Sequence, residues 1–190
     1  FVTPNSRVYD LGCSQGAATL ALRRHIQQPD VTIVAVDNAA PMIERCRSNI
    51  ASDLSPSPVQ LRCEDIQSTP IENASLIALN YTLQFVPLDQ REDLLARLYC
   101  GMNPGGGLIL SEKVRLPAAV QQECFTDWHH EFKRLNGYSD LEISQKRQAI
   151  ENVLIPESAQ DHIQRLQRAG FQQVYCWFQC FNFASFIAIK

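Results

Sequence analysis

The sequence lacks an excess of positive charge, and it lacks long apolar runs. Its 190 residues hold 17 Lys and Arg against 20 Asp and Glu, which leaves a net charge of −3. A large nucleic-acid surface favours a basic patch, so we expect no direct nucleic-acid partner. No apolar run approaches the ~20 residues of a membrane span, and no charged-then-apolar pattern opens the sequence. We therefore expect no membrane association and a cytoplasmic location.

The seven cysteines do not form the pattern of a disulfide framework, because their number is odd and their positions are scattered. Cys176 and Cys180 are close in sequence, but four residues along a strand span ~13 Å, too far for one metal. His129 and His130 are adjacent on a predicted helix and so do not share a face. We predict reduced thiols and no metal site.

Apolar, β-branched segments alternate with helical patterns through the first 111 residues. Strands are predicted at 7–9, 31–36, 59–63, 75–80 and 108–111, and helices at 15–28, about 40–52 and 87–100. This alternation is typical of an α/β fold with a mainly parallel sheet. A helix at 158–169 then precedes strands at 174–178 and 183–189, whose short connection predicts an antiparallel hairpin. The length indicates a single domain over residues 1–190 with a seven-stranded sheet.

Residues 113–156 interrupt the alternation, and we interpret them as a helical insertion. Its first helix repeats apolar side chains at helical spacing: Val120, Cys124, Trp128, Phe132 and Leu135. A capping box at 139–142 opens a second helix, which carries Lys146 and Arg147. Trp128 and Phe132 either pack in the core or form a dimer interface, and the sequence leaves both open.

The stretch 7–16, RVYDLGCSQG, predicts a short strand, a glycine-punctuated turn and the start of a helix. Glycine lets the backbone approach a ligand closely, and a helix N-terminus offers free N–H donors. Ligands of α/β sheets bind at the carboxyl ends of the strands. The stretch is therefore the candidate binding site for a nucleotide-like cofactor.

Four interpretations of this turn remain open. A dinucleotide loop of the form Gly-x-Gly-x-x-Gly fits poorly, because Ser14 replaces the middle glycine. Residues 12–16 match the nucleophile elbow Gly-x-Ser-x-Gly, but an elbow normally follows several strands. The spacing of Asp10, Gly12 and Gly16 matches the Asp-x-Gly-x-x-x-Gly loop of S-adenosylmethionine enzymes, which we favour. The fourth interpretation is a structural glycine turn without a ligand.

Polar residues follow the next strands at the same edge of the predicted sheet. Asp37 is placed to accept hydrogen bonds from ribose hydroxyls, and the alternative is a cap for the helix that follows. Asp65 beside Ile66 fits an adenine, with the carboxylate on the amino group and the aliphatic chain on the ring. The alternative for Asp65 is a solvated loop acid. Asn80 presents an amide at this edge.

The chain resembles the carboxy-S-adenosyl-L-methionine synthases, bacterial enzymes of wobble-uridine modification in tRNA. The resemblance covers essentially the whole chain and is most specific at residues 10–14, 43–47, 71–75, 82–85, 132–134, 136–139, 141–147 and 177–183. It implies a Rossmann-like class I methyltransferase fold. It also implies conversion of S-adenosyl-L-methionine and prephenate to carboxy-S-adenosyl-L-methionine and phenylpyruvate. A partner tRNA carboxymethyltransferase then uses the product to form 5-oxyacetyl-uridine.

The resemblance further implies roles for individual residues in a homodimer that holds no metal. The residues that it places around the cofactor are Gly12, Cys13, Ser14, Asp37, Asn38, Asp65, Ile66 and Asn80. Asp37 and Asn38 belong to the ribose side, and Asn80 lies near the methionine part. Arg147 binds the added carboxylate and comes from the neighbouring subunit. A cofactor-contacting tyrosine of the family's N-terminal segment has no counterpart in this sequence.

The proposed role of Arg147 agrees with simple electrostatics. An arginine beside a sulfonium is a like-charge pair, which a low-dielectric pocket disfavours. An extra carboxylate on the ligand offsets that repulsion through a charge-assisted hydrogen bond. Three other functions remain open: an ordinary S-adenosylmethionine-dependent small-molecule methyltransferase, a non-catalytic cofactor-binding protein and an elbow hydrolase. The first predicts methyl transfer and indifference to prephenate.

Overall fold

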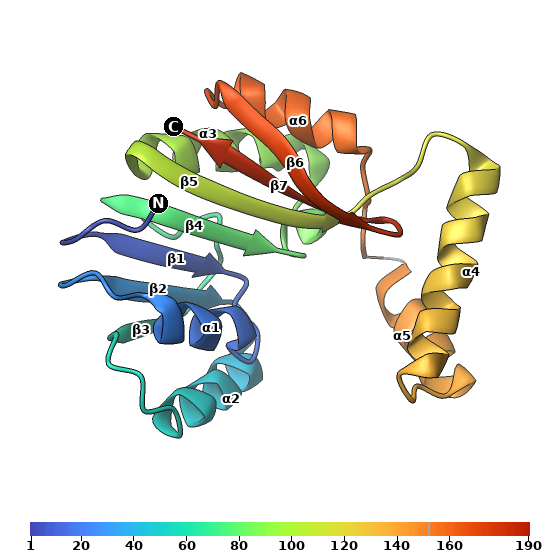
Figure 1. Cartoon of the computed structure of the whole chain (residues 1–190), viewed down its shortest axis with the longest axis horizontal. Helices are drawn as coiled ribbons and strands as arrows, with labels where there is room; N and C mark the ends of the chain where they lie inside the picture. The colour runs from blue at the N-terminus through green and yellow to red at the C-terminus, as the bar shows by residue number, and fades with distance from the viewer. Residues whose placement is uncertain (152) are drawn as a thin grey trace.

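A single sheet of seven strands forms the centre of the molecule (Figure 1). The computed structural model describes residues 1–151 and 153–190, apart from the side chains at 146, 147 and 149–151. The strand order across the sheet is β3-β2-β1-β4-β5-β7-β6. The strands are β1 (Arg7–Leu11), β2 (Thr32–Asp37), β3 (Val59–Cys63), β4 (Ala74–Asn80), β5 (Met102–Lys113), β6 (Gln173–Cys180) and β7 (Phe183–Ile189).

The sheet is parallel from β3 to β5, and the last two strands run antiparallel. The predicted seven-stranded sheet with a C-terminal hairpin is therefore confirmed. The chain passes from β1 outward through β2 and β3, then returns to place β4 on the other side of β1. The carboxyl ends of β1 and β4 thus flank the point where the strand order reverses, which is the usual ligand position in such sheets.

Helices cover both faces of the sheet, and the alternation of apolar side chains along each strand explains why. In β2, Val34 and Val36 belong to the core under α3 and α6, whereas Ile33 and Ala35 face the clusters that α1 and α2 complete. A strand buried on both faces needs apolar residues at nearly every position. The helices are α1 (Ala17–His25), α2 (Ala40–Ala51), α3 (Arg91–Gly101), α4 (Ala119–Leu135), α5 (Asp140–Glu151) and α6 (Ala159–Arg168), with 3₁₀ turns η1 (Leu83–Phe85) and η2 (Leu88–Gln90).

Two local predictions differ from the structure. Helix α1 is shorter than the expected 15–28, because Gly16 takes a left-handed φ of 87° and Ile26 takes an extended conformation. Ile26 is 8% exposed and packs in the cluster around Val8, so burial ends the helix early. Strand β5 begins at Met102 rather than at the expected residue 108, and its pairing with β4 shifts in register between Ala74 and Leu76. In α3, which lies within the predicted helix 87–100 apart from its last residue, Leu94, Leu95 and Leu98 are buried.

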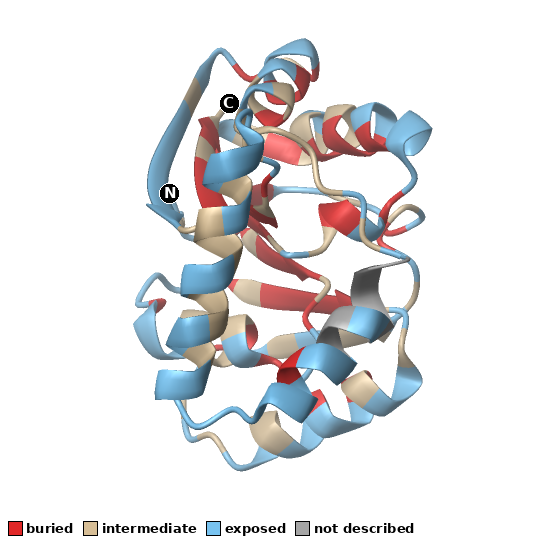
Figure 2. Cartoon of the chain, turned by 90° about the vertical axis from the view of Figure 1, so that its right-hand side faces the viewer, coloured by how far each residue is buried: buried red, intermediate tan, exposed pale blue. Residues whose placement is uncertain are grey.

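Helices α4 and α5 stand to one side of the sheet (Figure 1), and no residue of α4 is buried. Figure 2 looks onto α4, whose surface is exposed or intermediate along its length. Trp128 is 55% exposed and Phe132 is 53% exposed, so the prediction that they pack in the core is wrong for the single chain. The capping box at the start of α5 is confirmed, with Ser139 and Glu142 bonded reciprocally.

Two further properties concern membrane-spanning helices and the cysteines. In the part of the chain that the structure describes, no helix has the length and apolarity needed to cross a bilayer. All seven cysteines are free, and Cys176 and Cys180 lie on β6 as predicted.

Candidate functional site

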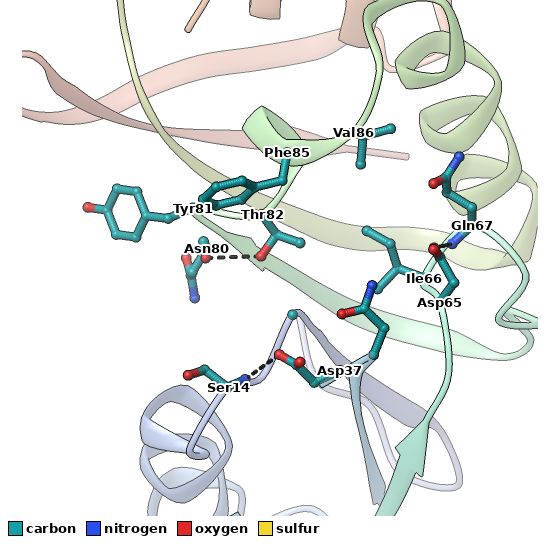
Figure 3. A pocket seen from close by; sticks show the side chains of 12 residues that line it. Ser14, Asp37, Asp65, Ile66, Gln67, Asn80, Tyr81, Thr82, Phe85 and Val86 are labelled. Carbon is teal, nitrogen blue, oxygen red and sulfur yellow. Dashed lines mark hydrogen bonds between the residues drawn. The ribbon is translucent and has the colours of Figure 1, made fainter. Parts of the chain in front are cut away.

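A cavity of about 450 Å³ opens at the carboxyl ends of β1 to β4 (Figure 3). Its volume lies within the range of roughly 300–1,000 Å³ that small-molecule sites span. Its position at the reversal of strand order is the expected one for a ligand. The lining residues are Gly12, Ser14, Asp37, Asn38, Asp65, Ile66, Gln67, Asn80, Tyr81, Thr82, Phe85 and Val86.

The glycine turn after β1 forms one wall of the cavity. Gly12 has a φ of 84°, and a Cβ at this position would lie 2.1 Å from Thr82 Oγ1. The N–H groups of Gly12 and Cys13 both donate to the carbonyl of Val36, at 2.8 and 2.9 Å. The turn is therefore tied to β2 by hydrogen bonds, and it packs directly against Thr82, the second residue after β4, at a distance that only glycine permits.

The carboxylate of Asp37 connects the glycine turn with the start of α2. Ser14 N donates to Asp37 Oδ2 at 2.9 Å, and Ala39 N donates to Oδ1 at 2.9 Å. A carboxylate has about four lone-pair sites, so two remain for ribose hydroxyls. The two interpretations of Asp37, a ribose acceptor and a cap before the helix, are thus compatible.

Ser14 does not have the surroundings of a catalytic nucleophile. Its side chain is exposed, and its Oγ lies 3.6 Å from the thioether sulfur of Met42. A serine nucleophile needs a general base in hydrogen-bond reach, and a thioether is not one. This contact gives the elbow interpretation no support.

Asp65 and Ile66 follow β3 on the opposite side of the cavity (Figure 3). Gln67 N donates to Asp65 Oδ1 at 2.8 Å, which holds the exposed carboxylate in place. Ile66 is only 8% exposed and presents an aliphatic surface beside that carboxylate. An acceptor next to an apolar surface fits the amino group and the ring of an adenine.

The segment after β4 closes the third side. Asn80 ends the strand, and its carbonyl accepts a hydrogen bond from Thr82 Oγ1 at 3.1 Å. Tyr81 has a φ of 57°, which is rare for a bulky residue. Tyr81 and Phe85 line the cavity, whereas Leu83 and Gln84 are buried.

Glu112 of β5 lies fully buried beneath this segment. Its Oε1 accepts the N–H groups of Thr82 and Leu83 at 3.1 and 2.8 Å, and its Oε2 accepts that of Gln84 at 3.2 Å. Burial raises the pKa of Glu112 to about 8, and the three N–H donors act in the opposite direction. The sequence interpretation missed this residue, although an acid two residues after the apolar run 108–110 was a signal.

The structure brings together most of the predicted ligand residues from four separate strands. Those that line the cavity are Gly12, Ser14, Asp37, Asn38, Asp65, Ile66 and Asn80. The structure adds Gln67 and Val86 to the lining. The only sign of this in the sequence was that each directly follows another residue of the lining. The binding role of each of these residues stays a prediction.

For two of the predicted residues, the structure describes no side chain that lines the cavity. Cys13 is 4% exposed and packs with Cys46 beneath the glycine turn, where burial raises the pKa of its thiol. Its side chain is therefore turned away from any ligand in the cavity. The side chain of Arg147 lies outside the described residues, so its carboxylate-binding role stays a prediction.

The chemistry of the lining fits an adenosyl ligand with a positive charge better than a dinucleotide. Among the described residues that line the cavity, two are acidic, Asp37 and Asp65, and none is a lysine or an arginine. A pyrophosphate would meet two carboxylates there, whereas a sulfonium meets favourable charges. The lining thus offers acceptors for hydroxyl and amino groups, an apolar surface for a base and a suitable field for a cation.

Comparisons with known proteins agree with this chemistry. A family model described as a methyltransferase domain matches residues 8–106. The carboxy-S-adenosyl-L-methionine synthase of Histophilus somni (strain 129Pt) is 57% identical over 190 residues, which cover 100% of this chain and 79% of that protein. The protein of the same name from Marinobacter nauticus is 60% identical over 190 residues, covering 100% of this chain and 76% of that protein.

Solved structures show the same fold at low identity. A putative O-methyltransferase from Nostoc punctiforme matches with a TM-score of 0.71 at 15% identity, covering 100% of this chain and 53% of that chain. Human N-acetylserotonin methyltransferase in complex with SAM matches with a TM-score of 0.65 at 16% identity, covering 97% of this chain and 47% of that chain. The sheet, the family match and the identity along the whole chain agree, and the chain belongs to the carboxy-S-adenosyl-L-methionine synthase family of S-adenosylmethionine-using enzymes with the class I methyltransferase fold.

Proposed function

We propose that this enzyme converts S-adenosyl-L-methionine and prephenate to carboxy-S-adenosyl-L-methionine, phenylpyruvate and water. The carboxyl group that prephenate loses replaces a hydrogen of the S-methyl group, and that proton leaves with the ring hydroxyl of prephenate as water. The observation that carries the proposal is the cavity itself, where two carboxylates flank an apolar surface at the reversal of strand order. The names of relatives at 57% and 60% identity supply the carboxyl-bearing product. The cavity accounts for the adenosyl part of both the substrate and the product.

In this proposal the lining residues bind and orient, and they exchange no proton with the substrate. Asp37 accepts the ribose hydroxyls while it keeps the glycine turn in place through Ser14 N. Asp65 accepts the adenine amino group, and Ile66 packs on the ring. Asn80 faces the methionine part from the end of β4. Positioning two substrates in this way lowers the barrier by removing translational and rotational freedom before reaction.

Arg147 distinguishes the proposed reaction from ordinary methyl transfer. It belongs to α5, in the insertion that stands beside the sheet. Near a sulfonium its charge is unfavourable unless the ligand also carries a carboxylate. We place it on the added carboxylate of the product, and on a carboxylate of prephenate before reaction, as a bidentate hydrogen-bond donor.

The proposal includes a homodimer in which Arg147 reaches the cavity of the neighbouring subunit. Trp128 and Phe132 on α4 support it, since both rings are more than half exposed in the single chain. Exposed apolar groups of this kind are typical of interaction surfaces. The product then serves a tRNA carboxymethyltransferase in the cytoplasm, where free cysteines remain reduced. We expect no direct contact of this enzyme with tRNA, given the net charge of −3.

Mass spectrometry of the small molecule that co-purifies with the protein tests the proposal first. We expect a species roughly 44 Da heavier than S-adenosylmethionine, the mass of one added carboxyl unit, held by a charge-assisted bond. The purified protein should also release phenylpyruvate from prephenate only when S-adenosylmethionine is present. Unmodified S-adenosylmethionine together with indifference to prephenate would instead identify an ordinary small-molecule methyltransferase.

The variant Arg147→Ala tests the carboxylate contact. We expect it to keep affinity for S-adenosylmethionine but to lose carboxy-product formation by 100-fold or more, on the order of 3 kcal/mol for a charged hydrogen bond. Arg168→Ala is the matched control, because Arg168 pairs with Glu92 on the surface of α6 and does not line the cavity. Normal carboxylating activity of Arg147→Ala would contradict this role.

A further inference from the structure

The segment that covers the cavity holds a backbone conformation that it would not adopt alone. Tyr81 has a φ of 57°, a left-handed conformation that costs a bulky residue on the order of 1–3 kcal/mol. The short 3₁₀ turn Leu83–Phe85 follows directly, so the chain reverses within a few residues. Conformations of this kind persist only where the surroundings impose them.

Glu112 imposes this conformation from beneath the turn. Three consecutive N–H groups, those of Thr82, Leu83 and Gln84, converge on its one carboxyl group at 2.8 to 3.2 Å. The Gln84 side chain adds a second tie, because its Nε2 donates to the carbonyl of Tyr81 at 3.3 Å. Glu112 is 0% exposed, so water cannot replace it as the acceptor.

A buried arginine, Arg91, holds carbonyl groups of the same segment. Arg91 Nη2 donates to the carbonyl of Gln84 at 3.0 Å, and its Nε donates to that of Val86 at 2.8 Å. Arg91 is itself 0% exposed and pairs with Glu157. The carboxyl group of Glu112 thus accepts from the N–H groups of the turn, and the guanidinium of Arg91 donates to its carbonyls.

The position of this turn determines the shape of the cavity. Thr82 stands so close to the glycine turn that a Cβ on Gly12 would lie 2.1 Å from its Oγ1 and 2.6 Å from its Cγ2. Thr82 Oγ1 also donates to the carbonyl of Asn80. Figure 3 shows Thr82 beside Asn80, with Tyr81 and Phe85 on the same segment. A shift of the turn would therefore move two walls of the site.

We propose that Glu112 is a positioning residue, whose buried carboxyl group holds the turn of residues 81–85 in the shape that binds the adenosyl ligand. It touches no ligand and acts through Thr82, Leu83 and Gln84. The proposal deepens the proposed function and rests on it only for the identity of the ligand. The ordering of the turn by Glu112 does not depend on what the enzyme does with prephenate.

Amide hydrogen exchange tests the ordering without any ligand. In Glu112→Gln the shape is kept, but one acceptor oxygen becomes an NH₂ group that faces the N–H of the turn. We expect exchange at Thr82, Leu83 and Gln84 to rise at least tenfold, while amides in the centre of β1 and β4 keep their protection. Unchanged exchange at these three amides would overturn the proposal.

Binding of S-adenosylhomocysteine, measured by calorimetry, tests the consequence for the site. If the turn in Glu112→Gln holds the competent shape about a tenth of the time, the dissociation constant rises about tenfold. Glu112→Leu, which lacks every acceptor, should bind more weakly still. Leu98→Ala is the control, because Leu98 is fully buried in the core on α3 but its side chain makes none of the hydrogen bonds that hold the turn.

The control separates positioning from general stability. Leu98→Ala should lower the urea midpoint of unfolding, because it leaves a cavity in the core, yet bind the ligand as the unchanged protein does. Equal loss of affinity in Leu98→Ala and Glu112→Gln would overturn the proposal in favour of a merely structural role. Failure of the unchanged protein to bind S-adenosylhomocysteine would refute the proposed function, and the exchange measurement would still decide the role of Glu112.

Discussion

The contact between Gly12 and Thr82 predicts a large and specific effect of Gly12→Ala. The new Cβ would meet Thr82 Oγ1 at 2.1 Å, and the residue would keep a φ of 84°. The left-handed conformation costs an alanine about 1–2 kcal/mol. Overpacking against a fixed neighbour adds about 1–3 kcal/mol. We therefore expect Gly12→Ala to lower the free energy of unfolding by about 2–5 kcal/mol and to weaken ligand binding.

A double-mutant cycle separates these two costs. Thr82→Ala removes Oγ1 and Cγ2, the two nearest atoms, and leaves a Cβ at 2.9 Å from the new methyl group. By itself it loses the hydrogen bond to the Asn80 carbonyl, worth about 0.5–1.5 kcal/mol. The double variant should be less destabilised than the sum of the single variants by about 1–2 kcal/mol, because most of the overpacking disappears.

Gly105→Ala is the matched control for backbone strain. Gly105 has a φ of 76°, but a Cβ there would meet nothing within 4 Å. This variant should lose only the cost of the left-handed conformation, about 1–2 kcal/mol. Urea unfolding followed by circular dichroism gives all the stabilities. Additivity of the Gly12 and Thr82 changes within about 0.5 kcal/mol would refute the close-contact explanation.

Two further predictions concern buried charge. His162 is 1% exposed, and neither ring nitrogen has a hydrogen-bond partner among the described residues. Burial lowers its pKa from 6.5 to about 4, so the stability that it contributes is full above pH 6.5 and falls as the pH drops toward 4. The difference in unfolding free energy between His162→Leu and the unchanged protein should therefore change by about 3 kcal/mol between pH 7 and pH 4. Parallel curves of unfolding free energy against pH for the two proteins would contradict this prediction. Arg91→Met should lower the free energy of unfolding by about 3–5 kcal/mol, because it leaves Glu157 without one buried partner, whereas Arg168→Met on the surface should change it by less than about 1 kcal/mol. Similar urea midpoints for these two variants would contradict the proposed importance of the buried pair.

The sequence predicted the sheet because local patterns carry its signal. In β2, every residue from Ile33 to Val36 is apolar, as a strand with two covered faces requires. The same segments end in the polar residues Asp37 and Asn80, and parallel strands bring such ends to one edge. The cavity lining was therefore largely readable before the structure was known.

The sequence left open those outcomes that depend on distant segments. Trp128 and Phe132 have the spacing of a buried helical face, but each is more than half exposed. The described contacts of α4, with α5 and with Phe181 and Phe183 of the C-terminal hairpin, leave no residue of this helix buried. Helical periodicity identifies an apolar face and says nothing about what lies against it. Cys13 likewise follows Gly12 in the candidate loop, yet its side chain points into the cluster with Cys46.

The sequence by itself determined the order of strands and helices, the family and the residues at the strand ends, because these depend on patterns within a few residues of each other. Only the tertiary structure decided that Glu112 and Arg91 hold the turn over the cavity. Each is a charged residue that is ordinarily solvated, and each is fully buried here. The partners of Glu112 in the turn lie 28 to 30 residues before it along the chain. The carbonyls that Arg91 holds lie 5 and 7 residues before it. Such contacts exist only once β4, β5 and α3 have packed together.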